Sequence, residues 1–213
     1  MKHAYLAEFF GTGFLLLVVT GSGVMGESLA AGNAGVALLA NSIATGAILF
    51  VLISLAGPIS GAHFNPIVTA FFWRNGSVTA RSATFYMLFQ FLGAMAGVLV
   101  AHFIFDLPLL QLSSKVRDGL GIFASEVIAV VTLLSVITLG TRYAAQALPM
   151  LIALTVTAGY WFTSSTFFAN PAVSVARTLT DTFVGISPLD TPIFCLAQIL
   201  GLGVFFAVRK WLS

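Results

Sequence analysis

Six long apolar stretches are the feature that most restricts how this chain can fold. They cover about residues 5–25, 34–57, 80–105, 120–140, 147–166 and 191–209. A helix needs about 20 mostly apolar residues to cross the hydrocarbon core of a bilayer. Only 8% of the residues are charged, whereas soluble domains carry about a quarter. The sequence therefore predicts an all-α membrane protein with six spanning helices in a single domain, residues 1–213.

Two further apolar pieces, about residues 66–74 and 171–180, are too short to cross. Each follows an Asn-Pro pair, Asn65-Pro66 and Asn170-Pro171. Proline suits the first turn of a helix, where its missing N–H would have no partner, and Asn is a good N-cap. Each pair therefore predicts the start of a short re-entrant half-helix.

The order of these features repeats along the chain. Glu8 lies on the first predicted span and Glu126 on the fourth, each followed by one Asn-Pro half-helix. A Gln-x-Leu-Gly motif then starts 25 residues after the first Asn and 28 after the second. Three spans per half is an odd number, so the second copy must enter the membrane upside down. We expect inverted repeats at about 1–105 and 119–213, with a site at the midplane between them.

The two half-helix starts predict a specific chemistry at that midplane. A helix N-terminus carries about half a positive charge, so two facing N-termini repel cations. The Asn65 and Asn170 amides can donate hydrogen bonds to the oxygen of a small uncharged molecule. Irregular backbone at this depth is tolerated only where it lines a watery path or is buried in protein.

Basic residues predict the orientation. With the N-terminus in the cytoplasm, six of the nine Lys and Arg residues fall on the cytoplasmic side and three outside, as the positive-inside rule requires. The cytoplasmic set is Lys2, Arg74, Arg81, Arg142, Arg209 and Lys210. We expect a multi-pass protein of the cell inner membrane with both termini cytoplasmic.

The stretch Ser60-Gly61-Ala62-His63-Phe64-Asn65-Pro66, together with the second Asn-Pro pair, resembles the aquaporin (major intrinsic protein) family over essentially the whole chain. The resemblance implies a homotetramer whose protomers each hold a pore for water or small neutral solutes, with no cofactor or bound metal. Asn65 and Asn170 would be the central donors.

The resemblance also implies that Glu8 and Glu126 hold backbone N–H groups of the re-entrant loops. The alternative for both is proton relay, because a carboxylate inside a span is usually functional. His63 would support its loop, with a pH sensor as the alternative.

One departure from the family concerns the narrowest point of the pore. Most members have an arginine directly after the second Asn-Pro-Ala, where this chain has Val173. Counting from the two Asn residues, without insertions, places Thr45, Ala158 and Phe167 at the other filter positions. These residues predict a wider and less polar filter, although an inward Phe167 ring would narrow it.

The sequence from Asn170 to Phe183 resembles a bacterial aquaporin branch that is associated with arsenic resistance and lacks the filter arginine. This resemblance implies passage of arsenite as neutral As(OH)3 and of glycerol-sized polyols. Arg177 lies one helical turn beyond Val173, so it could replace the missing charge at the outer mouth. The alternative is a surface arginine paired with Asp181.

Two other functions remain open from the sequence: a strict water channel, and an ion-coupled transporter with broken helices. A transporter would need a charged midplane residue beside the Asn pair. An enzyme is not expected, because no Ser-His-Asp set, metal-ligand cluster or phosphate loop is visible. A net charge of +2 does not indicate a nucleic-acid partner.

Overall fold

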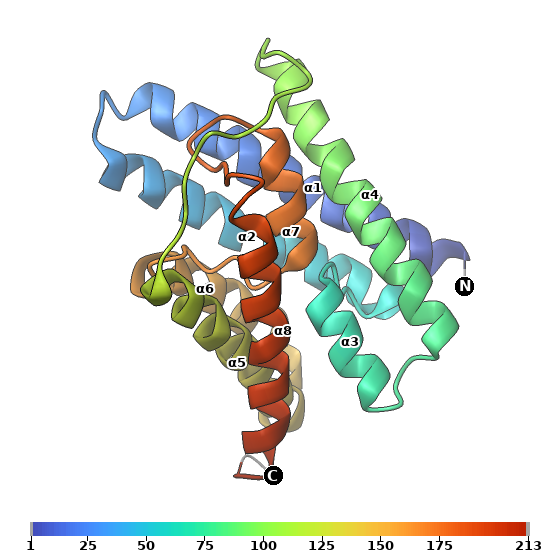
Figure 1. Cartoon of the computed structure of the whole chain (residues 1–213). Helices are drawn as coiled ribbons and strands as arrows, with labels where there is room; N and C mark the ends of the chain where they lie inside the picture. The colour runs from blue at the N-terminus through green and yellow to red at the C-terminus, as the bar shows by residue number, and fades with distance from the viewer. Residues whose placement is uncertain (1, 212–213) are drawn as a thin grey trace.

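The computed structural model describes residues 2–211 as a bundle of helices (Figure 1). The six long helices are α1 (Lys2–Leu29), α2 (Ala34–Ser60), α4 (Ala80–Ile104), α5 (Leu120–Tyr143), α6 (Leu148–Phe162) and α8 (Thr191–Val208). Two are short, α3 (Pro66–Arg74) and α7 (Pro171–Ala176). Six segments are long and apolar enough to span a membrane, the fifth being α6 with the 3-10 turn before it. No β-strand occurs in residues 2–211, so the predicted all-α membrane fold is confirmed.

Two predicted segments end earlier than expected. The stretch 147–166 leaves the helical conformation at Thr163 (φ −111°, ψ 135°), and the chain then enters the loop before the second Asn-Pro pair. The helix after that pair ends at Ala176 and continues as a 3-10 turn, Arg177–Leu179. Apolar content alone did not reveal these ends, because much of each loop is itself buried.

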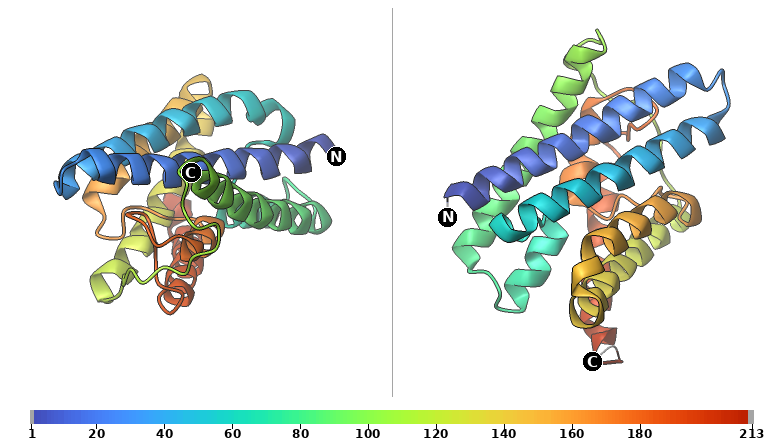
Figure 2. Two further views of the ribbon diagram at one scale, coloured as in Figure 1. Left: turned by 90° about the horizontal axis from the view of Figure 1, so that it is seen from above. Right: turned by 180° about the vertical axis from the view of Figure 1, so that it is seen from behind.

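The helices pack in two matching groups. In the first half α1 lies against α2 and α4, and in the second half α5 lies against α6 and α8. Figures 1 and 2 show the two short helices, α3 and α7, held between these groups. Both groups hold each short helix, because α3 and α7 each lie against α4 of the first half and α8 of the second.

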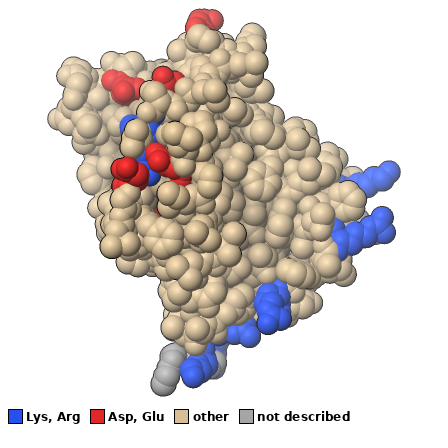
Figure 3. All heavy atoms as spheres, viewed as in Figure 1, with Lys and Arg blue, Asp and Glu red and all other residues tan. Residues whose placement is uncertain are grey.

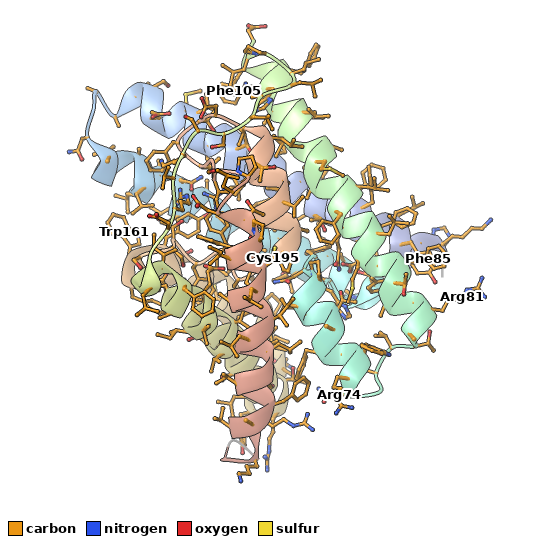
Figure 4. All side chains as sticks on the ribbon, viewed as in Figure 1. Arg74, Arg81, Phe85, Phe105, Trp161 and Cys195 are labelled. Carbon is orange, nitrogen blue, oxygen red and sulfur yellow. The ribbon has the colours of Figure 1, made fainter. Side chains whose placement is uncertain are left out.

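Charged side chains lie at the two ends of the molecule, with a broad uncharged surface between them (Figure 3). Arg74 and Arg81, near the turn between α3 and α4, point away from the bundle at one end (Figure 4). The uncharged surface is rich in exposed apolar side chains, such as Phe10 and Leu55. Such a surface suits contact with lipid or with other apolar protein surfaces.

Glycines allow α1 and α4 to cross closely. A Cβ at Gly93 would lie 2.1 Å from the Phe9 carbonyl oxygen, and one at Gly97 would lie 2.1 Å from that of Gly13. Both obstacles are backbone atoms, so neither can move without shifting a helix. Small residues at such crossings let membrane helices approach closely.

Gly97→Ala should therefore lower the thermal stability of the detergent-purified protein, with a cost of about 1–3 kcal/mol from overpacking. Gly203→Ala on α8 is the matched control, because no heavy atom lies within 4 Å of its added Cβ. The control should be neutral or slightly stabilising, since Ala has the higher helix propensity. Equal melting midpoints for the two variants would contradict the close crossing.

Candidate functional site

The two Asn-Pro pairs start the two short helices. Asn65 is the N-cap of α3, and its Oδ1 accepts the Ile67 N–H at 2.8 Å. Asn170 is the N-cap of α7, and its Oδ1 accepts the Ala172 N–H at 3.0 Å. In both helices proline occupies the first turn. The side-chain oxygen of each Asn is thus used locally, which turns its amide nitrogen outward.

Each amide nitrogen crosses to the opposite loop. Asn65 Nδ2 donates to the Ala169 carbonyl at 2.8 Å, and Asn170 Nδ2 donates to the Phe64 carbonyl at 2.8 Å. Each acceptor directly precedes the other Asn in the chain. The half-helices therefore begin at the same place, and each is tied to the start of the other. An Asn amide has two N–H groups, so each side chain keeps one donor for a molecule in the cavity.

The loops before the two Asn residues are strained. Ala62 and Phe64 in the first loop have φ of 50° and 48°. Thr166, Phe167 and Ala169 in the second have φ of 63°, 55° and 48°. Non-glycine residues seldom adopt this left-handed conformation, which costs of order 1–3 kcal/mol each and persists only where the surroundings impose it.

Glu8 holds the first loop. Its two oxygens accept the backbone N–H groups of His63 at 3.0 Å and Phe64 at 2.7 Å. They also accept the Ser60 hydroxyl at 2.6 Å and the Gln90 amide at 2.7 Å. The carboxylate is fully buried, and these four donors replace its hydration.

Glu126 does the same in the second loop. It accepts the N–H groups of Phe168 at 3.0 Å and Ala169 at 2.9 Å, and the Gln198 amide at 2.6 Å. We call Glu8 and Glu126, with the backbone N–H groups that they accept, the two clamps. Each clamp places a carboxylate against one strained loop. This arrangement supports the expected loop-holding role over proton relay, because the oxygens are occupied by donors that do not release protons.

His63 packs on the side of the first loop. Its Nδ1 lies 3.1 Å from Thr69 Oγ1, and its ring stacks on Phe72 with centroids 4.7 Å apart. The side chain is buried and lines the central cavity. These contacts fix the ring in place, which agrees with the loop-supporting role expected for His63.

A cavity of about 90 Å³ runs beside the two Asn residues. Most of its lining is aliphatic or aromatic. The polar and charged side chains on its wall are Thr45, His63, Asn65, Tyr160, Asn170 and Arg177. Because the wall offers few hydrogen-bonding groups, it can bind a small polar molecule only weakly.

Three of the four predicted filter residues line this cavity: Thr45, Phe167 and Val173. The Phe167 ring packs against Gly159, where a Cβ would lie 2.3 Å from the ring. Thr45 Oγ1 lies 3.1 Å from the Tyr160 hydroxyl. The wall here combines one hydroxyl pair with apolar side chains.

Ala158 differs from the prediction. It is exposed on the outer surface and is absent from the cavity wall, whereas Tyr160 is buried and lines the cavity. The count from Asn170 assumed a loop without length changes, and the residue that lines the cavity lies two positions later. Tyr160 could have been found from its helical spacing, because Ile152, Val156 and Tyr160 recur every four residues on one face of α6.

Arg177 is not a surface residue. It is 2% exposed, lines the cavity, and has its guanidinium carbon 3.6 Å from the centroid of the Phe168 ring. Its Nε donates to the Val184 carbonyl. Asp181 instead accepts the Ser114 N–H at 2.8 Å and the Ser114 hydroxyl at 2.9 Å, which lower the pKa of that carboxyl. The alternative of a surface arginine paired with Asp181 is therefore wrong.

Among the described residues, no group of three or more His, Cys, Asp or Glu lies together as metal ligands would. The site is built from amides, hydroxyls, one imidazole, one arginine and apolar walls. These groups can form hydrogen bonds to a small molecule in the cavity.

Comparison with known proteins gives a consistent result. The major intrinsic protein family model matches residues 1–165. Aquaglyceroporin AqpS of Rhizobium meliloti is 49% identical over 207 residues, 97% of this chain and 88% of its own length. The lens fiber major intrinsic protein of Lithobates pipiens is 38% identical over 100 residues, 47% of this chain and 36% of its own. The X-ray structure of the aquaglyceroporin from Plasmodium falciparum superposes with a TM-score of 0.76 at 19% identity, over 98% of this chain and 95% of that one.

The clamps predict the effect of removing a carboxylate oxygen. Glu126→Gln places an NH2 group where an oxygen now accepts a backbone N–H, and an unsatisfied buried donor costs about 1–3 kcal/mol. We expect a lower melting midpoint and reduced water permeability in vesicles. Glu27→Gln, at an exposed position, is the matched control and should change neither. Unaltered stability of Glu126→Gln would contradict the clamp.

Proposed function

Because the chain belongs to the major intrinsic protein family, whose members are channels for water and small solutes and not enzymes, we propose that its pore is wide enough for neutral solutes of glycerol size and for arsenous acid, As(OH)3. The observation that carries the proposal is the filter wall. Val173 stands where an arginine would be expected, and the neighbouring wall is formed by Thr45, Tyr160 and Phe167.

The chemistry of this wall suits uncharged solutes that carry hydroxyl groups. The Thr45 and Tyr160 hydroxyls can exchange hydrogen bonds with a polyol or with As(OH)3, while Val173 and Phe167 contact its apolar face. Asn65 and Asn170 then offer one amide N–H each at the middle of the path. The 49% identical relative is named an aquaglyceroporin, which agrees with a solute larger than water.

We further propose that the chain forms one domain of two inverted repeats, about 1–105 and 119–213. We place this domain in the inner membrane, with both termini on the cytoplasmic side. The matching helix groups support the repeat. The basic residues that gather at one end of the molecule (Figure 3) support the orientation, as the positive-inside rule requires. We also propose a homotetramer, which would cover part of the exposed apolar surface. The mass of the detergent-purified protein tests this oligomeric state.

Stopped-flow light scattering on vesicles tests the proposal. Osmotic gradients of glycerol and of arsenous acid should each give swelling well above that of protein-free vesicles, with water flux as the positive control. Water flux without either solute would identify a strict water channel and refute the wide filter. Solute flux that followed a membrane potential or a pH gradient would instead indicate the ion-coupled transporter.

Val173→Arg should narrow the filter and restore a charged donor there. We expect glycerol flux to fall at least about tenfold relative to water flux, which corresponds to about 1.4 kcal/mol. Val173→Ile adds bulk without charge and should lower glycerol flux much less. If Val173→Arg kept the glycerol-to-water ratio of the parent, Val173 would not lie at the constriction.

Arg177→Ala should raise the leak of protons or cations, if Arg177 supplies the charge that repels them. A pH-sensitive dye inside the vesicles measures the leak under an imposed potential. Arg142→Ala, at an exposed position at the far end of α5, is the control. Equal leak in the two variants would leave Arg177 without a role in charge exclusion.

A further inference from the structure

Two arginines lie over one aromatic ring beside the cavity, although they are 60 residues apart in the chain. The guanidinium carbons of Arg177 and Arg117 lie 3.6 Å and 5.2 Å from the centroid of the same ring, that of Phe168. Phe168 and Arg177 line the cavity. The face of an aromatic ring attracts cations, and here one ring receives two.

Both guanidinium groups are held in the same way. Arg177 donates through Nε to the Val184 carbonyl, and Arg117 donates through Nε to the next carbonyl, Gly185, at 2.8 Å. Within residues 2–211 neither side chain has another hydrogen bond or an ion pair. The terminal nitrogens of both arginines therefore keep their donors for another molecule, and those of Arg177 belong to a side chain that is 98% buried on the cavity wall.

Three nearby carboxylates accept hydrogen bonds from other groups. Asp190 accepts the backbone N–H of Arg117 at 2.7 Å, and Asp181 accepts both donors of Ser114. Glu126 is the clamp of the second loop. A third cation, Lys115, donates to the Phe183 carbonyl at 2.5 Å and adds to the positive field.

The positive charge of Arg117 persists at neutral pH. Burial lowers its pKa to about 10, which is still well above 7. Each guanidinium group is planar and keeps free terminal nitrogens, so each matches the geometry of a carboxylate or another oxoanion and can bind it with charge-assisted hydrogen bonds.

We propose that Arg117 and Arg177 form an anion site at the outer mouth of the pore, which captures small weak acids as their anions. The inference rests on the proposed channel function and adds a solute class to it. The captured anion takes a proton from the outside water, and the neutral acid then passes the apolar filter. One proton and one anion cross together, so no net charge enters the pore.

Lactate and glycerol are suitable probes because both have three carbons and so meet the same filter. Uptake of each is measured into neutral phosphatidylcholine vesicles, at a slightly acidic outside pH. We expect the parent to carry lactate, and we expect Arg117→Gln to lower the ratio of lactate to glycerol flux several-fold. Arg117→Lys keeps the charge and should keep most of the ratio, and Arg142→Gln should keep all of it.

Salt supplies a test on the unaltered protein. Raising the ionic strength from about 0.01 M to about 1 M shortens the Debye length from about 30 Å to about 3 Å. The lactate-to-glycerol ratio should fall in the parent, and it should fall much less in Arg117→Gln, which has lost one of the three positive charges. Glycerol flux without lactate flux, or the same ratio in the parent and Arg117→Gln, would overturn the anion site and leave the proposed function standing.

If neither lactate nor glycerol crosses the membrane, the proposed function is refuted. A binding measurement can still test the anion site in that case. Phenylglyoxal modifies accessible arginines, and mass spectrometry of the peptides reports each one. Lactate should protect Arg117 from modification and leave Arg142 unprotected. Equal modification of Arg117 with and without lactate would overturn the site.

Discussion

The reciprocal bonds between the two re-entrant loops are the interaction on which the rest of the structure depends. Each Asn amide donates to the carbonyl just before the other Asn. Two helix N-termini that face each other repel, since both carry partial positive charge. The paired bonds hold them together without neutralising that charge, and one donor of each amide stays available for the pore. The same contact thus shapes the path and leaves on its wall one amide donor from each Asn and the partial positive charge of two helix starts.

The cost of this arrangement is met by the surrounding helices. Five residues with left-handed backbone lie directly before the half-helices, and a buried carboxylate on α1 or α5 accepts the N–H groups that this conformation exposes. Gln90 and Gln198 complete each carboxylate shell. The long helices therefore serve as a frame for two strained loops. Side chains such as Val173, to which we assign solute selection, take no part in holding these loops.

Much of this architecture could be predicted from the sequence. Hydrophobic length gave the six long helices, and the Asn-Pro pairs marked where α3 and α7 begin, because local chemistry decides both. Positions set by loop geometry were harder. Counting back from Asn170 selected Ala158 and missed Tyr160, because the sequence does not show where α6 ends and the loop before Asn170 begins. The environment of Arg177 was equally hard to predict. Its partners Phe168 and Val184 lie in two loops whose conformation cannot be inferred from the spacing of residues in the sequence. Arg117 joins it only through tertiary structure.

A double-mutant cycle on the two asparagines tests the central claim most directly. Melting midpoint and water permeability are compared for Asn65→Ala, Asn170→Ala and the variant that carries both. Residues that act as one unit show strong non-additivity. Because each amide secures the loop that carries the other, either single change should lose most of the water flux, and the double change should cost much less than the sum of the two. Additive effects, or a single variant with the permeability of the parent, would contradict the account.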